Sequence, residues 1–141
     1  MVIKNKILVL VYRRFNENLK FLALRNNPKD PRHGGDFWYV ITGGVEGTES
    51  LEEAVKRELF EETGITNTLS IQNMEIVYEY SGRDPEVLFK EYAFIAEVSE
   101  DVKSLNEEHV EYEWLSKDNF IERIKWEGDD LKTFIQKAYG E

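Results

Sequence analysis

Three glutamates stand close together near the end of a predicted helix, within the segment RELFEETGI at residues 57–65. At about 100° of rotation per residue, Glu58, Glu61 and Glu62 fall within an arc of roughly 100°, so their carboxylates can converge. Their charges repel one another, and the negative end of the helix dipole adds to that repulsion. A hard divalent cation such as Mg²⁺ or Mn²⁺ would relieve it, because such ions prefer oxygen ligands.

An exposed acidic patch is the simpler interpretation of these glutamates, since glutamate favours helices and is usually exposed. Two features favour a cation site instead. The glutamates lie toward the same side as the predicted core-facing residues Leu51 and Val55. Arg57 can pair with Glu61 at i+4, but one guanidinium does not neutralise the whole set.

The elements that position these residues follow from hydrophobic patterning and turn residues. Ser50 and Glu53 have the spacing of a capping box, which predicts a helix from Leu51 that closes at Gly64. Strands are expected at 6–14, 19–26, 37–42, 71–82, 86–98 and 109–115. A second helix is expected over 129–141, with an apolar stripe of Leu131, Phe134, Ile135 and Ala138.

Composition limits the class of protein. A chain of 141 residues suits a single domain spanning 1–141. Its net charge of -10 disfavours nucleic acid and anionic membranes as partners. The absence of cysteine excludes disulfides and thiolate chemistry and fits a cytoplasmic protein. The apolar run near the N-terminus is too short to span a bilayer, so we expect a strand there.

Residues 43–65, GGVEGTESLEEAVKRELFEETGI, resemble the Nudix box at every fixed position. The matching residues are Gly43, Glu49, Arg57, Glu58, Leu59, Glu61, Glu62, Gly64 and Ile65. The chain is therefore identified as a member of the MutT-like Nudix hydrolase family. The resemblance implies an α/β fold, the Nudix α/β/α sandwich with a mixed sheet, and cleavage of a nucleoside diphosphate linked to another group.

The resemblance also implies roles for particular residues. Arg57 and Glu49 would hold the glycine-rich loop against the helix and so support catalysis. The ligands of Mg²⁺ or Mn²⁺ would be Glu58, Glu61, Glu62 and a backbone carbonyl at Thr42 or Gly43.

A second stretch, NEEHVEYEWLS at 106–116, resembles an EH…W-aliphatic element of two branches of the family. These are the diadenosine polyphosphate hydrolases and the dihydroneopterin triphosphate pyrophosphatases, in which a loop glutamate serves as base or extra metal ligand. The resemblance favours Glu108 for that role, with Glu107 or Glu61 as alternatives. Without it, the stretch would be interpreted as an acidic loop, and His109 as a loop or packing residue.

The substrate is set outside the Nudix box. FWYVITGGVEGTE at 37–49 resembles the pyrophosphatase branch, which implies an NTP, a dNTP or dihydroneopterin triphosphate, cleaved to pyrophosphate and a monophosphate. The alternative is a dinucleoside polyphosphate hydrolase of the diadenosine tetraphosphate type. Substrate contacts are expected among nearby cations and aromatics, each of which also has a structural alternative: Arg13, Arg25, Arg32, His33, Tyr12, Phe37 and Trp38.

Two further expectations concern the class of protein and its assembly. A Nudix-fold module that binds nucleotides without cleaving them is a third hypothesis, but the intact set of box glutamates disfavours it. A homodimer is the prior for assembly, since symmetric pairs are the commonest oligomers.

Overall fold

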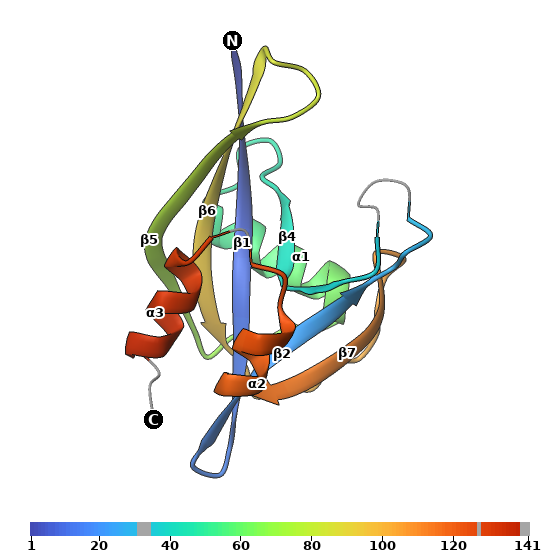
Figure 1. The fold of residues 1–141 in the computed structure, drawn as a ribbon, viewed down its shortest axis with the longest axis vertical. Helices are drawn as coiled ribbons and strands as arrows, with labels where there is room; N and C mark the ends of the chain where they lie inside the picture. The colour runs from blue at the N-terminus through green and yellow to red at the C-terminus, as the bar shows by residue number, and fades with distance from the viewer. Residues whose placement is uncertain (31–34, 127, 139–141) are drawn as a thin grey trace.

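The computed structural model describes residues 1–30, 35–126 and 128–138 and places a mixed sheet between helices on its two faces (Figure 1). Within these ranges the sheet has seven strands. They are β1 Val2–Phe15, β2 Asn18–Asn26, β3 Trp38–Tyr39, β4 Ile41–Gly44, β5 Ser70–Ser81, β6 Val87–Glu97 and β7 His109–Ser116. The helices are α1 Leu51–Thr63, α2 Lys117–Arg123 and α3 Asp130–Ala138. The predicted α/β/α sandwich with a mixed sheet is confirmed.

The middle of the central strand β1, residues 7–12, is buried on both faces, which explains the unbroken apolar run there. Because side chains alternate along a strand, Ile7 and Val9 pack with the buried side of α1. Leu8 and Leu10 point the other way and pack with the buried residues of α2 and α3. One strand therefore joins both layers of the core.

The strands fork along β1. Lys6–Val9 pair with β4, whereas Tyr12–Phe15 pair with β2. Strand β2 then pairs with β3 and β7, so that the sheet divides on this side of β1. On the other side, β6 runs parallel to β1 and pairs antiparallel with β5.

The fork corrects one prediction from the sequence. The segment 37–42 was expected to form one strand, but its residues belong to two strands that meet at Val40. Tyr39 pairs with Leu24 of β2, whereas Ile41 pairs with Val9 of β1. The apolar pattern of residues 37–42 fits one strand or two, because pairing with β1 or with β2 favours the same kind of apolar residue.

Helix α1 has the predicted start and end. The Ser50 hydroxyl accepts a hydrogen bond from the Glu53 amide at 3.1 Å, and the Glu53 carboxylate accepts one from the Ser50 amide at 2.7 Å. Gly64 ends the helix with φ 76, a left-handed conformation that favours glycine. Leu59 is buried and Phe60 is 55% exposed, as the predicted core-facing stripe requires.

The C-terminal part contains a helix that the sequence pattern did not reveal. Helix α2 has seven residues, and its buried side chain is Phe120, which stacks on Phe21 with ring centroids 5.2 Å apart. The predicted helix that follows is α3, with Leu131 and Ile135 buried. The side chain of Ala138 and the expected continuation to residue 141 lie outside the described residues. None of the described helices has the length and apolar character needed to cross a bilayer.

Candidate active site

Arg57 gathers the carboxylates of the loop and of α1 around one guanidinium group. Its Nη2 donates to Glu49 at 2.7 Å and to the Gly44 carbonyl at 2.6 Å. Its Nη1 donates to Glu58 at 2.9 Å and to Glu61 at 3.3 Å. The hydrogen bond from Arg57 is the main reason why the pKa of Glu49 is lowered. Arg57 thus attaches the glycine-rich loop to the helix.

Glu62 is in a different situation from the other two glutamates of the cluster. Its side chain is 1% exposed, and neither carboxylate oxygen has a hydrogen-bond partner among the described residues. Burial, and then the neighbouring carboxylates of Glu58 and Glu108, raise the pKa of Glu62 well above its ordinary value. A buried carboxylate without hydrogen bonds is costly, so its oxygens are suited to a ligand.

Glu108 and His109 lie near Glu62, Glu108 at the end of a tight turn and His109 as the first residue of β7. The Asn106 side chain accepts a hydrogen bond from the Glu108 amide at 3.1 Å. Asn27, at the end of β2, holds the turn with two hydrogen bonds, from its amide to the Glu108 carbonyl and from its side chain to the Glu107 carbonyl, both at 2.9 Å. One ligand atom from each of Glu62, Glu108 and His109 lies within 4.8 Å of the others.

Gly43 makes room for the Glu58 side chain. A Cβ atom at this position would overlap the carboxyl group of Glu58, whereas a Cβ atom at Gly44 would meet nothing within 4 Å. The glycine therefore lets the carboxylate lie against β4. Burial is the main reason why the pKa of Glu58 is raised.

These residues fit the Mg²⁺ or Mn²⁺ that the sequence led us to expect. The unsatisfied oxygens of Glu62 and the close approach of Glu58 to Gly43 supply oxygen donors of the kind that such ions prefer. Glu61 stands further out, with its side chain 50% exposed. Part of the expected repulsion is relieved without metal, because Arg57 contacts Glu58 and Glu61.

A cleft of about 500 Å³ opens beside this cluster. Its acidic and polar lining comes from five strands, from α1 and from the turn before β7, through Asn26, Thr42, Glu62, Glu79, Glu91, Glu108 and His109. Its aromatic lining consists of Phe37, Tyr39, Tyr78, Tyr80 and Trp126, and two cations, Lys6 and Lys125, also face it. The cleft thus combines a carboxylate cluster, planar rings and positive charges, which suits a molecule that has both a phosphate chain and an aromatic base.

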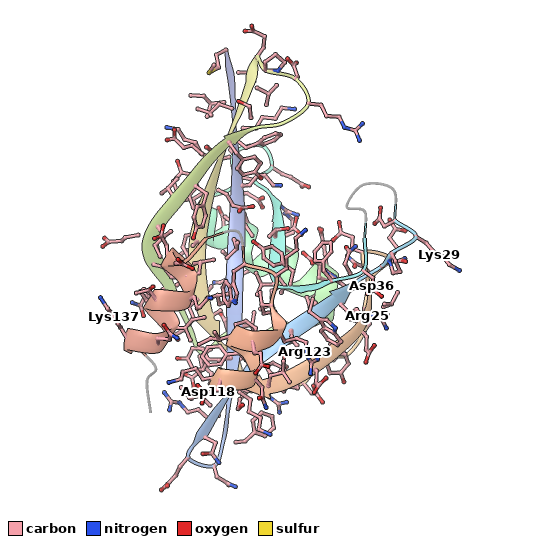
Figure 2. All side chains as sticks on the ribbon, viewed as in Figure 1. Arg25, Lys29, Asp36, Asp118, Arg123 and Lys137 are labelled. Carbon is pink, nitrogen blue, oxygen red and sulfur yellow. The ribbon has the colours of Figure 1, made fainter. Side chains whose placement is uncertain are left out.

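The predicted substrate-binding residues are only partly found at the cleft. Phe37 lines it, but in the described part of the chain the lining does not include Arg13, Arg25 or Trp38. Arg25 pairs instead with Asp36 at 2.7 Å and with Glu111 at 3.1 Å, and Figure 2 shows Arg25 beside Asp36.

The other predicted contacts have separate positions. The guanidinium of Arg13 lies 4.6 Å from the ring centre of Phe15, and that of Arg123 lies 5.0 Å from the ring centre of Trp38. The Tyr12 hydroxyl donates to Glu97 at 3.3 Å. The predicted contacts at residues 32 and 33 lie outside the described residues.

Several residues that line the cleft were not expected there from the sequence: Lys6, Tyr39, Tyr78, Tyr80, Lys125 and Trp126. One available signal was the alternation in β5, which places Tyr78 and Tyr80 on the same face. Lys125 and Trp126 gave no such signal, because they follow the short helix α2 that the pattern did not reveal.

Comparison with known protein families decides the family. The model of the NUDIX domain matches residues 4–137. This chain belongs to the Nudix family. The match extends over nearly all of the chain, beyond the box itself, and agrees with the order of elements around α1.

Two curated relatives are similar to this Nudix chain. An octanoyltransferase of Myxococcus xanthus is 34% identical over 109 residues, which are 77% of this chain and 30% of that protein. The chain thus corresponds to less than a third of that relative's length. A dihydroneopterin triphosphate diphosphatase of Haemophilus influenzae is 25% identical over 130 residues, covering 84% of this chain and 78% of that protein.

Solved structures share the Nudix fold. A MutT protein from Methanosarcina mazei has a TM-score of 0.70 and 26% identity, covering 96% of this chain and 92% of that chain. A C. elegans Ap4A hydrolase, solved as a binary complex, has a TM-score of 0.68 and 21% identity, with 96% and 95% of the two chains covered. The second likeness bears on the fold alone.

Proposed function

We propose that this Nudix chain hydrolyses a diphosphate linkage in a nucleoside triphosphate-like substrate and releases pyrophosphate and a monophosphate. The observation that carries the proposal is the buried, unsatisfied carboxylate of Glu62 beside a cleft with aromatic and cationic walls. The candidate substrates are an NTP, a dNTP and dihydroneopterin triphosphate. The similarity to a dihydroneopterin triphosphate diphosphatase supports this group.

The metal is proposed to be Mg²⁺ or Mn²⁺. Its ligands would be carboxylates of Glu58, Glu61, Glu62 and Glu108, together with a backbone carbonyl at Thr42 or Gly43. A divalent ion bound there would neutralise phosphate charge and make the phosphorus more electrophilic. Arg57 and Glu49 support catalysis indirectly, because their ion pair at 2.7 Å holds the loop that carries Gly43 and Gly44 near α1.

Glu108 is the proposed general base. Water attacks a phosphorus atom, a phosphorus–oxygen bond to the pyrophosphate group breaks, and the water proton passes to the Glu108 carboxylate. Its support is position, since Glu108 lines the cleft and its backbone is held by Asn27 and Asn106. Glu107 and Glu61 are the alternatives, and both are exposed.

The walls of the cleft suggest how the substrate lies. We propose that the phosphates face the carboxylate cluster and its cation, while Lys6 and Lys125 compensate the remaining negative charge. The aromatic base of the substrate would contact the rings of Phe37, Tyr78 and Trp126, which line the same cleft. This assignment replaces the earlier expectation of Arg13, Arg25 and Trp38.

A dinucleoside polyphosphate hydrolase is the second candidate. It is supported by the EH…W-aliphatic element at 108–115. A dinucleotide carries a second nucleobase, for which the cleft would also need room. The two candidates therefore differ in which substrates are cleaved and in which products appear.

A substrate panel tests the proposed function. The protein is incubated with Mg²⁺ or Mn²⁺ and with NTPs, dNTPs, dihydroneopterin triphosphate, dinucleoside polyphosphates and sugar nucleotides, and the products are separated by ion exchange. We expect pyrophosphate and a monophosphate from a triphosphate, and a strong decrease in Glu61→Gln. Preferential cleavage of dinucleotides would favour the second candidate. Nucleotide binding without turnover on any substrate would favour the non-catalytic module.

A further inference from the structure

We propose that His109 is a nitrogen ligand of the divalent cation in this cleft, so that the site favours first-row transition ions over Mg²⁺. The inference rests on the proposed function, because it concerns the cation of the same site. It adds one nitrogen ligand to the proposed metal site and specifies the class of ion that the site prefers.

The spacing of the three side chains supports a shared ion. Metal–ligand bonds to oxygen or imidazole nitrogen are about 2.0–2.2 Å long, so two ligands of one ion are at most about 4.4 Å apart. The ligand atoms of Glu62, Glu108 and His109 lie within 4.8 Å of one another. Closing around an ion therefore needs movements of less than about 1 Å, which side chains can make.

Burial supplies a second and independent reason to expect a ligand. The side chains of Glu62 and His109 are 1% and 9% exposed, and His109 Nδ1 lies 3.4 Å from Glu62 Oε1. Neither oxygen of Glu62 has a hydrogen-bond partner among the described residues, although the carboxylate lies close to Glu108 and His109. An ion between these atoms would satisfy the carboxylate and use the imidazole nitrogen beside it.

The backbone fixes the direction of approach of His109. It is the first residue of β7 and pairs with Asn26 of β2, and its amide donates to the Asn106 carbonyl at 3.3 Å. Both neighbouring segments are therefore held before any ion binds. A preformed set of donors of this kind makes selection among ions effective.

Ligand chemistry gives the expected preference. Carboxylate oxygens suit Mg²⁺ and Mn²⁺, whereas imidazole favours transition ions, with affinity rising from Mn²⁺ through Fe²⁺ and Co²⁺. A site in which one imidazole joins the carboxylates would still accept Mn²⁺ but would bind Mg²⁺ less well. A site made of oxygen ligands alone would show no contribution from His109 for either ion.

Pulsed EPR of bound Mn²⁺ tests the ligand directly, because it detects a nitrogen nucleus bonded to the ion. The sequence has two histidines, His33 and His109, so a matched control is available. Untagged protein in a buffer without imidazole is measured as wild type, His109→Gln and His33→Gln. We expect nitrogen coupling in the wild type and in His33→Gln, and its loss in His109→Gln.

Binding constants give a second measurement on the same proteins. In His109→Gln we expect the Mn²⁺ dissociation constant to rise by about tenfold or more, since the loss of even an indirect partner of a metal ligand costs about 10–100-fold. The Mg²⁺ constant should change by less than about twofold, because that ion gains little from imidazole. Equal changes for the two ions would contradict the proposed selectivity.

Labelling the wild type with ¹⁵N-histidine repeats the test without a substitution, so a misfolded variant cannot obscure it. The label should change the nitrogen coupling of bound Mn²⁺. Bound Mn²⁺ without nitrogen coupling, or coupling that survives in His109→Gln, would overturn the inference. Pyrophosphate release together with an all-oxygen Mn²⁺ signal would refute the role of His109 and leave the hydrolase intact. Coupling without turnover on any substrate would refute the hydrolase alone.

Discussion

At the scale of single residues, the three glutamates of α1 are not equivalent. Arg57 contacts Glu58 and Glu61 at 2.9 Å and 3.3 Å, so one guanidinium relieves part of their mutual repulsion. Glu62 is buried, has no hydrogen-bond partner among the described residues, and lines the cleft. The proposed need for a cation is therefore concentrated on Glu62 and its neighbours, Glu108 and His109.

The raised pKa of Glu62 predicts how stability depends on pH in the absence of metal. The folded protein keeps a proton on Glu62 that the unfolded chain releases above about pH 4.3, so the free energy of unfolding should fall as pH rises from there across neutral pH. The slope is at most about 1.4 kcal/mol per pH unit for one group. Glu49 has a lowered pKa, so its contribution is lost only at lower pH.

Urea unfolding at several pH values between 5 and 8 in EDTA measures this effect. Glu62→Gln should flatten the decline and should be more stable than the wild type at pH 8. Glu52→Gln is the matched control, because Glu52 is an exposed glutamate of the same helix. Parallel pH curves for the wild type and Glu62→Gln would contradict the account.

The sequence predicted the convergence of the glutamates but could not distinguish among them. Helical spacing places Glu58, Glu61 and Glu62 on one side, and this is all that spacing can do. Glu62 lies beside Glu108 and His109, and the side chain of Asn27 holds the turn that brings these two residues there. Contacts between segments so far apart in sequence leave no periodic pattern.

At the scale of elements, strand β4 and helix α1 have to approach closely for the carboxylates to lie near the cleft. Gly43 allows this, because the Glu58 side chain occupies the space of a Cβ atom. Patterning predicted the positions of α1 and of most strands, since burial on alternate or on both faces leaves a clear signal. It did not predict that 37–42 divides between β3 and β4, or that α2 exists, since α2 has only seven residues.

Gly43→Ala is expected to be destabilising and to reduce metal binding. The methyl group has to displace the Glu58 carboxylate, and overpacking of this kind typically costs about 1–3 kcal/mol. Gly44→Ala is the neighbouring control, since its Cβ atom has open space, and its cost should stay within about 0.5 kcal/mol. Unfolding curves with and without Mg²⁺ measure both effects. Equal behaviour of the two variants would refute the role of Gly43.

At the scale of the whole molecule, an acidic protein with a net charge of -10 is proposed to take a polyanionic substrate. Two lysines at the cleft, Lys6 and Lys125, do not balance the negative charge of the protein and of such a substrate. We therefore expect a divalent cation to supply much of the local positive potential. The family match and the box residues establish the class of fold, whereas the cleft walls that we propose to select the substrate come from segments with ordinary strand and loop patterns.

Metal should therefore stabilise the folded protein as a whole. At a concentration 100 times its dissociation constant, Mg²⁺ or Mn²⁺ would add about 2.7 kcal/mol, which corresponds to a rise in Tm of about 5–10 °C for a chain of this size. Glu62→Gln should reduce that rise, and Glu52→Gln should not. Differential scanning calorimetry gives the result. An unchanged Tm at saturating metal would count against the site.

The most direct test of the central claim is the turnover number of Glu62→Gln beside that of Glu52→Gln. It is measured at saturating metal on the triphosphate that the wild type cleaves best. If Glu62 helps to hold the cation that stabilises the negative charge formed during cleavage, its variant should lose about 100-fold or more in kcat, while the control keeps the wild-type value. Wild-type turnover by Glu62→Gln would contradict the claim that this buried carboxylate carries the activity.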